Sequence, residues 1–290
     1  MNNLIWHYTS LEVLKSIFLE KEPRLRATHF QQFFDKNEFH LAGDYLIEEM
    51  HKSNQWANSY YHVFLKNLLS KVRFRDDYYV ISFSKSCDNY CMWKNYASGG
   101  CSIGFQACIV PRLFSYNVFF GDMGGLNYQP EYGRLLDCRY LTDDECDKLW
   151  NRRLELQSGG YFEDLIKVKV FASLLADIFN TKKCDYFFEN ETRLVLRYVT
   201  DKRFAKCNIP SPLPYHENDH SYLYCPFNQL LKKQPIQIMF APDADIKEGE
   251  SIVKEIIRKH GLNITMSYGK SVIGDCAKCM RPSNCKNCLK

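Results

Sequence analysis

Strand-like and helical segments follow one another along this chain without the regular alternation that builds a parallel α/β sheet. Runs rich in β-branched and aromatic residues, the usual composition of strands, lie at 4–8, 79–84, 102–105, 191–199, 236–240 and 263–267. Helical periodicity or capping residues occur from Thr9 onward, over 39–72, over 89–97, from Thr142 toward Leu154, over 165–179 and from Asp245 to Gly261. This order predicts an α+β fold in which helices flank a mixed or antiparallel sheet.

The chain of 290 residues has enough apolar side chains to fill a complete core. Hydrophobic residues make up 46% and aromatic residues 15%, which excludes a disordered chain. The length predicts one large domain over 1–270, with a helical insertion at about 39–72, followed by a short tail over 271–290. The 38 Lys and Arg residues against 34 Asp and Glu give a formal charge of +4, which neither requires nor excludes a nucleic-acid partner.

No apolar stretch approaches the roughly 18 residues that a membrane-spanning helix needs. The most apolar candidate, 168–179, contains Lys169 and Asp177. The first ten residues lack the basic and apolar regions of a secretory signal. We therefore expect no membrane association and a cytoplasmic location. In that compartment the nine cysteines between Cys87 and Cys225 would be free thiols, most of them small core residues.

Four more cysteines are concentrated in the last 15 residues, in the pattern Cys276-x2-Cys279-x5-Cys285-x2-Cys288. Two CxxC pairs offer four thiolates, and four sulfur ligands are typical of a structural Zn²⁺ site. The sequence therefore predicts a small four-cysteine zinc knuckle with no open ligand position, which serves stability or partner contact. An iron–sulfur cluster and a disordered tail that binds metal adventitiously are the alternatives.

The segment His216-Glu217-Asn218-Asp219-His220 matches the HExxH motif of zinc proteases. That chemistry needs both histidines on one face of a helix. Prolines at 210, 212 and 214 precede the segment, Pro226 follows it, and its central residues are weak helix formers. We interpret the segment as a solvated polar loop and exclude a protease site there.

A further set of candidate residues is spread over four predicted segments. It consists of His7 on the first strand, Ser82 and Ser84 on one face of a later strand, Tyr90, Trp93 and Tyr96 on a short helix, and Glu189, Glu191 and Arg193 at the start of the strand 191–199. Each has an ordinary explanation alone, because strand histidines are usually structural, aromatic residues are usually core, and surface ion pairs contribute little. The alternation in 191–199 predicts one buried face and one face toward solvent or a cleft. Their joint occurrence favours a functional site.

Several short blocks, in this order, resemble a known bacterial family. The blocks are Ile5-Trp6-His7-Tyr8-Thr9-Ser10, then Leu25-Arg26-Ala27-Thr28 leading to Asp35 and Glu38, Ile81-Ser82-Phe83-Ser84, Met92-Trp93-x-x-Tyr96-Ala97 with Gly100-x-x-Ile103-Gly104-Phe105, and Glu189-x-Glu191-x-Arg193-Leu194. They resemble the family known as domain of unknown function 2971, from about residue 4 to about residue 268. That family is similar in its core pattern to ADP-ribosyltransferases, so the resemblance implies a split β-sheet that holds NAD in a cleft.

The resemblance also implies roles for the candidate residues. It implies that His7, with Tyr8 and Thr9, binds the cofactor ribose, and that Ser82, Ser84, Tyr90, Trp93 or Tyr96 contacts or stacks on nicotinamide. It further implies that Glu191 is the catalytic carboxylate and that Glu189 activates the acceptor. Arg193 would pair with one of these carboxylates or with the cofactor pyrophosphate.

Cleavage of the bond between nicotinamide and ribose develops an oxocarbenium-like cation, which a carboxylate in a dry cleft stabilises. The leading hypothesis is therefore an NAD-dependent ADP-ribosyltransferase or NAD glycohydrolase that passes ADP-ribose to a protein, a nucleic acid or water. Such an activity would suit a toxin or an anti-phage defence effector. The hypothesis requires Glu191 and His7 to line one pocket. No glycine-rich GxGxxG loop is present, so a Rossmann-type NAD site is not expected.

Two alternatives belong to other classes. In the first, the same cleft belongs to a non-catalytic module that binds a nucleotide or peptide, and Glu191 and Arg193 form a structural pair. In the second, the chain is a nucleic-acid-binding protein that contacts phosphates through the zinc tail and nearby Lys and Arg residues.

Overall fold

The computed structural model describes residues 3–32, 76–114, 134–142, 144–145, 148, 179–199, 215–217 and 220–271. Three expected segments lie outside these residues. They are the helical insertion at 39–72, residues 165–178 of the helix expected over 165–179, and the four cysteines of the tail. The division into a domain and a tail therefore remains a prediction from the sequence.

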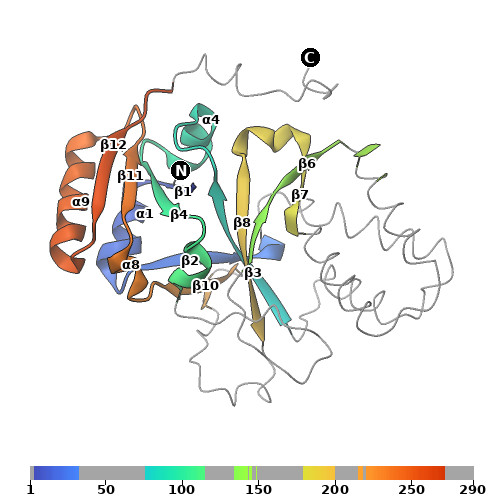
Figure 1. Ribbon diagram of the computed structural model, residues 1–290, viewed down its shortest axis with the longest axis horizontal. Helices are drawn as coiled ribbons and strands as arrows, with labels where there is room; N and C mark the ends of the chain where they lie inside the picture. Colours follow the sequence, from blue (N-terminus) through green and yellow to red (C-terminus); the bar gives the residue numbers. More distant parts are fainter. Residues whose placement is uncertain are drawn as a thin grey trace.

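A ten-stranded mixed sheet forms the centre of the described structure (Figure 1). Its strands are β1 (Leu4–Thr9), β2 (Arg24–His29), β3 (Asp76–Ser84), β4 (Cys101–Gln106), β5 (Arg134–Asp137), β8 (Glu191–Val199), β9 (Tyr215–Glu217), β10 (His220–Pro226), β11 (Ile236–Phe240) and β12 (Ile264–Tyr268). The main path is β12-β11-β4-β1-β3-β2-β10-β9, and β8 joins β3 to β5. The β11·β12 pair is parallel and the other pairs described in this sheet are antiparallel. A separate parallel pair consists of β6 (Arg139–Leu141) and β7 (Thr181–Lys183).

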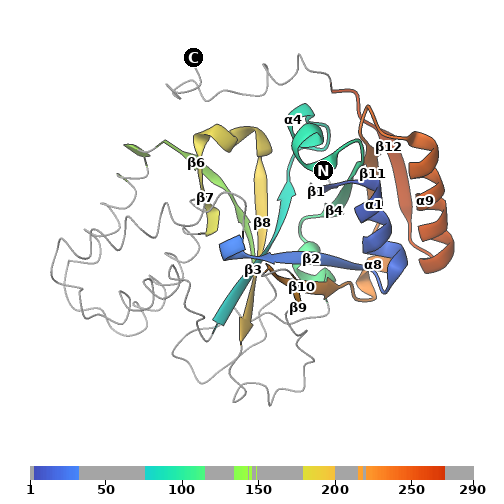
Figure 2. The ribbon, with the colours of Figure 1, turned by 180° about the vertical axis from the view of Figure 1, so that it is seen from behind.

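The sheet divides at β3. One edge of β3 pairs with β8 along its whole length, from Asp76 to Ser84. The other edge is shared, because β1 pairs opposite Ser84 whereas β2 pairs opposite Tyr79 and Val80. The two halves of the sheet, β1-β4-β11-β12 and β2-β10-β9, therefore separate beside β3. Figures 1 and 2 show β2 running across the direction of β8.

Helices of contrasting length accompany the sheet. The long helix is α9 (Ile246–His260), and the short ones are α1 (Leu11–Lys15), α4 (Tyr90–Met92), α5 (Val110–Leu113), α8 (Leu230–Lys233), the π-helical turns η1 (Ser16–Glu20) and η3 (Trp93–Ala97), and the 3-10 turns η2 (Phe30–Gln32) and η4 (Cys184–Glu189). Asp245 caps α9 by accepting from the amide of Glu248 at 3.0 Å, and Gly261 ends it at φ 64°. Both ends of this helix confirm the sequence prediction. Gly249 lets α9 approach β11, because a Cβ there would clash with the Phe240 ring.

Neighbouring residues of β1 enter different hydrophobic clusters on the two faces of the sheet. Ile5 belongs to the larger core, which also contains Phe83 and side chains of α1 and α9. Trp6 and Tyr8 belong to a smaller cluster with Trp93 on the other face. This alternation is the period of two expected of a strand. It means that β1 is buried on both faces.

Three local expectations need correction. The first helix is capped by Ser10, not Thr9, since the Ser10 hydroxyl accepts from the amide of Val13 at 3.2 Å. In the HExxH segment, residues 216, 217 and 220 lie in the paired strands β9 and β10 and not in a loop. Over 191–196, where the side chains are described, the strand at 191–199 has no open face, because every side chain from Glu191 to Leu196 is buried. Elements from outside the strand therefore cover the face that carries its charges.

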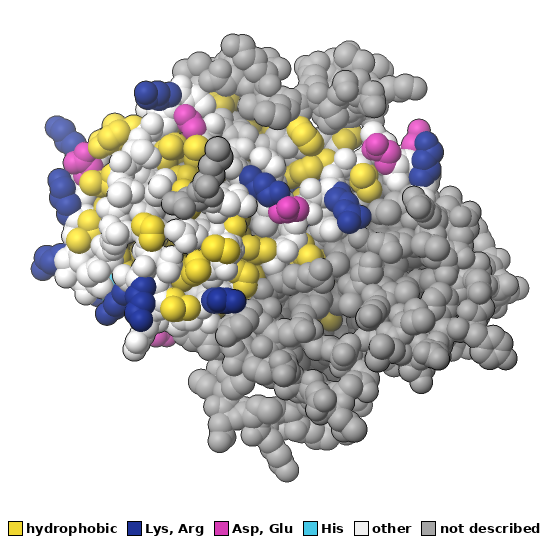
Figure 3. All heavy atoms as spheres, viewed as in Figure 1, with side chains coloured by type: hydrophobic (Ala, Val, Ile, Leu, Met, Phe, Trp, Pro, Cys, Tyr) yellow, Lys and Arg dark blue, Asp and Glu magenta, His cyan; other side chains and the backbone are white. Residues whose placement is uncertain are grey.

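Among the described residues no helix is long and apolar enough to cross a membrane. Figure 3 shows hydrophobic side chains scattered over the half of the surface that carries β11, β12 and α9, with Lys and Arg side chains along its outer edge.

Candidate functional site

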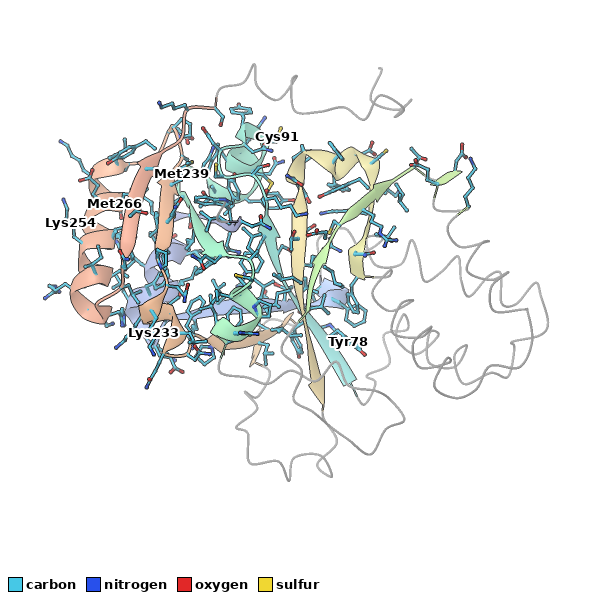
Figure 4. All side chains as sticks on the ribbon, viewed as in Figure 1. Tyr78, Cys91, Lys233, Met239, Lys254 and Met266 are labelled. Carbon is cyan, nitrogen blue, oxygen red and sulfur yellow. The ribbon has the colours of Figure 1, made fainter. Side chains whose placement is uncertain are left out.

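Four charged side chains meet at the beginning of β8. We call Lys182, Glu189, Glu191 and Arg193 the charged cluster. Each is at most 6% exposed, although residues of these types are almost never fully buried unless they are paired. The cluster contains two cations and two carboxylates, so its formal charges cancel. Side chains fill the space between β8 and β7 in Figure 4.

Glu191 and Arg193 form a bidentate ion pair on one face of β8. Nε of Arg193 donates to Oε1 of Glu191 at 3.0 Å, and its second terminal nitrogen donates to Oε2 at 2.9 Å. Its other terminal nitrogen donates to the carbonyl of Phe179 at 2.9 Å. Burial alone would raise the pKa of Glu191, but the charges of Arg193 and Lys182 hold it far below its ordinary value. Glu191 is therefore a permanent anion with both oxygens occupied.

Lys182 joins the two carboxylates. Its Nζ donates to Oε2 of Glu191 at 2.9 Å and also donates to Oε2 of Glu189. Glu189 is the last residue of η4 and Glu191 is the first residue of β8. Asn190 between them adopts the left-handed conformation at φ 43°, and the chain reverses there. Asparagine tolerates this conformation better than most residues. The reversal brings Glu189 and Glu191 to the same ammonium group.

Glu189 differs from Glu191 because it reaches the surface through Tyr96. The Tyr96 hydroxyl donates to Oε1 of Glu189 at 2.5 Å, and the Tyr96 side chain on η3 is 49% exposed. Burial raises the pKa of Glu189 and the negative charge of Glu191 raises it further, against the attraction of Lys182. The two carboxylates therefore have pKa values displaced in opposite directions.

Cys138, which lies between β5 and β6, and Tyr140 of β6 supply two more contacts. The amide of Glu191 donates to the Tyr140 hydroxyl at 2.5 Å, and Sγ of Cys138 lies 3.7 Å from Oε2 of Glu191. Sequence reasoning did not select Lys182, Cys138 or Tyr140. They belong to no recognisable motif, and they reach the cluster from β7 and from the segment that follows β5. A spacing pattern within one element could not have identified them.

The structure does not bring His7 to this cluster. Trp6 pairs with Ser84 and Ser84 pairs with Glu191, so Glu191 lies in the row of Trp6, whereas His7 is the next residue along β1 and pairs with Ile103. Because successive side chains of a strand point to opposite faces, His7 and Glu191 face opposite sides of the sheet. The expectation that they line one pocket is therefore wrong.

A structural role explains His7. Its Nδ1 lies 3.1 Å from the carbonyl of Ser82, and its ring packs edge-on against Phe83. The bonded carbonyl lies where β3 changes partner from β1 to β2, so the imidazole takes the place of a strand partner there. Burial lowers the pKa of His7, the bond to Ser82 opposes this, and the charge of Arg26 adds to the lowering. A neutral imidazole suits this site.

Three of the other expected cofactor-binding residues make internal contacts. The Tyr8 hydroxyl donates to the carbonyl of Ser86 at 2.8 Å, and the Ser84 hydroxyl donates to the carbonyl of Glu189 at 2.6 Å. Trp93 is buried against Tyr8, with its ring nitrogen donating to Asp88 at 2.8 Å.

Three residues of that set remain. Thr9 is buried, and Tyr90 is partly buried. The Ser82 hydroxyl is buried close enough to Glu191 to contribute to its low pKa, but it makes no hydrogen bond of ordinary geometry. Of the three expected stacking residues, Tyr96 is therefore the one whose side chain is both exposed and in contact with the charged cluster.

The predicted zinc ligands Cys276, Cys279, Cys285 and Cys288 lie outside the described residues. Within the described ranges, no group of three or more His, Cys, Asp or Glu side chains could hold a metal ion. Six of the described cysteines are free thiols, and Cys101, Cys184 and Cys225 among them are buried as expected. Cys91 is disulfide-bonded, which differs from the expectation of free thiols.

Comparisons with known proteins gave no match: no family model, no curated protein and no solved structure matches this chain.

Proposed function

We propose that this chain is an enzyme that breaks the bond between nicotinamide and ribose in NAD and transfers ADP-ribose to a macromolecule or to water, with Glu189 and Tyr96 in place of the Glu191 and His7 pair that the sequence led us to expect. The contact between Glu189 and the half-exposed Tyr96 carries the proposal, because it connects a buried pair of carboxylates to the surface. The sequence blocks that resemble an ADP-ribosyltransferase-like family support it. The division of the sheet at β3 is compatible with the split sheet of those enzymes.

The geometry favours Glu189 over Glu191 as the reacting carboxylate. Two neighbouring carboxylates whose pKa values are driven apart are typical of acid–base catalysis. Glu191 is held as an anion between two cations, Arg193 and Lys182, whereas Glu189 accepts from one cation, Lys182, and from the half-exposed Tyr96. Glu191 is therefore a positioning residue that fixes Lys182. Glu189 has a raised pKa and lies next to the exposed ring, so a ligand that stacks on Tyr96 would approach Glu189 first.

In the proposed reaction, the bond from C1′ of the ribose to the nicotinamide nitrogen breaks, and its electron pair leaves with neutral nicotinamide. The acceptor oxygen or nitrogen forms the new bond to C1′, and its proton passes to the carboxylate of Glu189. Tyr96 would stack on the nicotinamide ring and exclude water. General-base catalysis of this kind contributes on the order of 10²–10⁴-fold.

The test is the variant Glu189→Gln, which keeps the shape of the side chain but cannot accept the proton. We expect nicotinamide release from NAD to fall at least about 100-fold, with the thermal unfolding midpoint measured in parallel. The matched control is Glu255→Gln, which removes a carboxylate from the surface of α9 and should keep wild-type turnover. Wild-type turnover in Glu189→Gln would refute the assignment.

A non-catalytic nucleotide-binding module is the second candidate. The observation that favours it is the saturation of the cluster, since both oxygens of both carboxylates already accept hydrogen bonds. Calorimetric titration distinguishes the two candidates, because a binding module would bind NAD without releasing nicotinamide. The structural zinc site of the tail remains a prediction on either view.

A further inference from the structure

Two arginine–tyrosine stacks lie on the paired strands β2 and β10. Cζ of Arg24 is 4.1 Å from the centre of the Tyr224 ring, and Cζ of Arg26 is 4.3 Å from the centre of the Tyr222 ring. The register pairs Arg26 with Tyr224 across the strands. Each arginine therefore reaches diagonally to the tyrosine beyond its direct partner, and the four side chains form one continuous row on one face. We call Arg24, Arg26, Tyr222 and Tyr224 the arginine–tyrosine ladder.

The two guanidinium groups of the ladder have no acidic partner in the part of the chain that the structure describes. Arg26 is exposed and Arg24 is partly buried, and their contacts are with tyrosine rings. Arg193 shows the contrast, because a carboxylate and a carbonyl occupy its nitrogens. A ring beneath a guanidinium holds it in place without using its N–H donors. Those donors therefore remain available to an anion.

The ladder lies on the same face of the sheet as the charged cluster. On β2, Thr28 pairs with Val80 of β3. On β3, Ser82 pairs with Arg193 of β8. Arg26 is two residues from Thr28, and Ser82 is two residues from Val80. Residues two apart on a strand share a face, so the face that carries Glu191 and Arg193 also carries Arg24 and Arg26. Arg26 is also close enough to His7 to lower its pKa. The ladder thus extends from the place where the sheet divides.

We propose that the arginine–tyrosine ladder binds single-stranded nucleic acid. Two residues along a strand separate the arginines by about 6.6–6.8 Å, which is comparable to the distance between successive phosphates of an extended strand. Guanidinium groups bind phosphates, and both aromatic rings and guanidinium planes stack on unpaired bases. An acidic peptide would use the charges but not the stacks. The ladder is independent of NAD cleavage, so either proposal can fail alone.

The test is fluorescence anisotropy of labelled mixed-sequence 12-mers of single-stranded DNA and RNA with the full chain. We expect Arg24→Gln/Arg26→Gln to bind at least about tenfold more weakly than wild type, because the variant loses both phosphate-binding cations. The slope of log affinity against log salt should shrink by about 1.4, since each lost phosphate contact removes about 0.7. Arg24→Lys/Arg26→Lys keeps the charges but not the guanidinium planes, so its affinity should fall with little change in salt slope.

The matched control removes two cations elsewhere. Lys254 and Arg258 lie on the exposed side of α9, with side chains 69% and 81% exposed, and Figure 4 shows Lys254 at the outer edge of the molecule. Lys254→Gln/Arg258→Gln should bind both oligonucleotides as tightly as wild type, and so should Glu189→Gln. Thermal unfolding midpoints establish that each variant is folded.

Three results would overturn the proposal. They are absence of oligonucleotide binding by wild type at low salt, equal losses in the ladder and α9 variants, and competition by a poly-glutamate peptide as effective as that by unlabelled oligonucleotide. The last would indicate a surface that recognises charge alone.

Discussion

The charged cluster at the start of β8 and the sheet division around His7 are both polar regions beside β3, yet their polar groups behave differently. In the cluster, four charges compensate one another away from water, and a half-exposed tyrosine connects them to the surface. At the division, a single imidazole replaces a missing strand partner for the carbonyl of Ser82. The first arrangement displaces two carboxylate pKa values in opposite directions, and the second keeps a histidine neutral.

The chemical type of a residue therefore does not reveal its role. His7 and the Glu189-x-Glu191 pair were both expected from the sequence to belong to one site. The fold separates them, because one position of register places them on opposite faces of the same sheet.

The largest expected effect comes from breaking the ion pair of the cluster. Arg193→Met leaves Glu191 buried beside a single cation, and removing one partner of a buried pair typically costs about 3–5 kcal/mol. Urea unfolding should show this loss in the free energy of unfolding. The control is Lys85→Met, which removes the partly exposed partner of Asp137 (2.7 Å) and should cost at most about 1 kcal/mol. Equal small losses in both variants would mean that the cluster is not a buried, compensated unit.

An intermediate effect is expected from Tyr96→Phe, which deletes one hydroxyl. The stability should fall by about 1 kcal/mol, the usual contribution of one hydrogen bond. The hydrogen bond from Tyr96 lowers the pKa of Glu189, so its removal raises that pKa. If Glu189 acts as the base, the acid limb of the pH–rate profile for nicotinamide release must move to higher pH. An unmoved limb in a folded Tyr96→Phe variant would argue against Glu189 as the titrating base.

The smallest effect is expected at the sheet division. His7→Gln preserves a donor for the carbonyl of Ser82, so it should cost less than about 1 kcal/mol at neutral pH and leave nicotinamide release unchanged. Because the folded-state pKa of His7 is lowered from 6.5, the unfolded chain binds more protons just below that pH. The contribution of neutral His7 to the free energy of unfolding is therefore present above about pH 6.5. It is lost as the pH falls from about 6.5 toward the folded-state pKa of His7.

Denaturant unfolding of wild type and His7→Gln at several pH values measures this slope. The variant should show a weaker dependence on pH between the ordinary and the lowered pKa. A strong loss of nicotinamide release in His7→Gln would instead restore the histidine to the site and remove the contrast between the two regions.

Local signals in the sequence predicted much of the fold. Asp245 and Gly261 define both ends of α9, because capping involves groups within a few residues of each other. The runs at 79–84, 191–199 and 236–240 became β3, β8 and β11 because their side chains suit a buried pleated surface. The strands β9 and β10 at the HExxH segment cannot be predicted from its polar composition, because they form by pairing with each other and, for β10, with β2.

Local patterns along the chain are enough to predict the α+β class, the main strands and two carboxylates on one short segment. Which carboxylate meets the surface depends on long-range packing, since Tyr96 and Glu189 are 93 residues apart and Lys182 comes from a different sheet. Capping and periodicity act between near neighbours, so they carry no information about such packing. Register, burial and charge compensation arise when distant segments pack together, and they decide whether a polar side chain is structural or reactive.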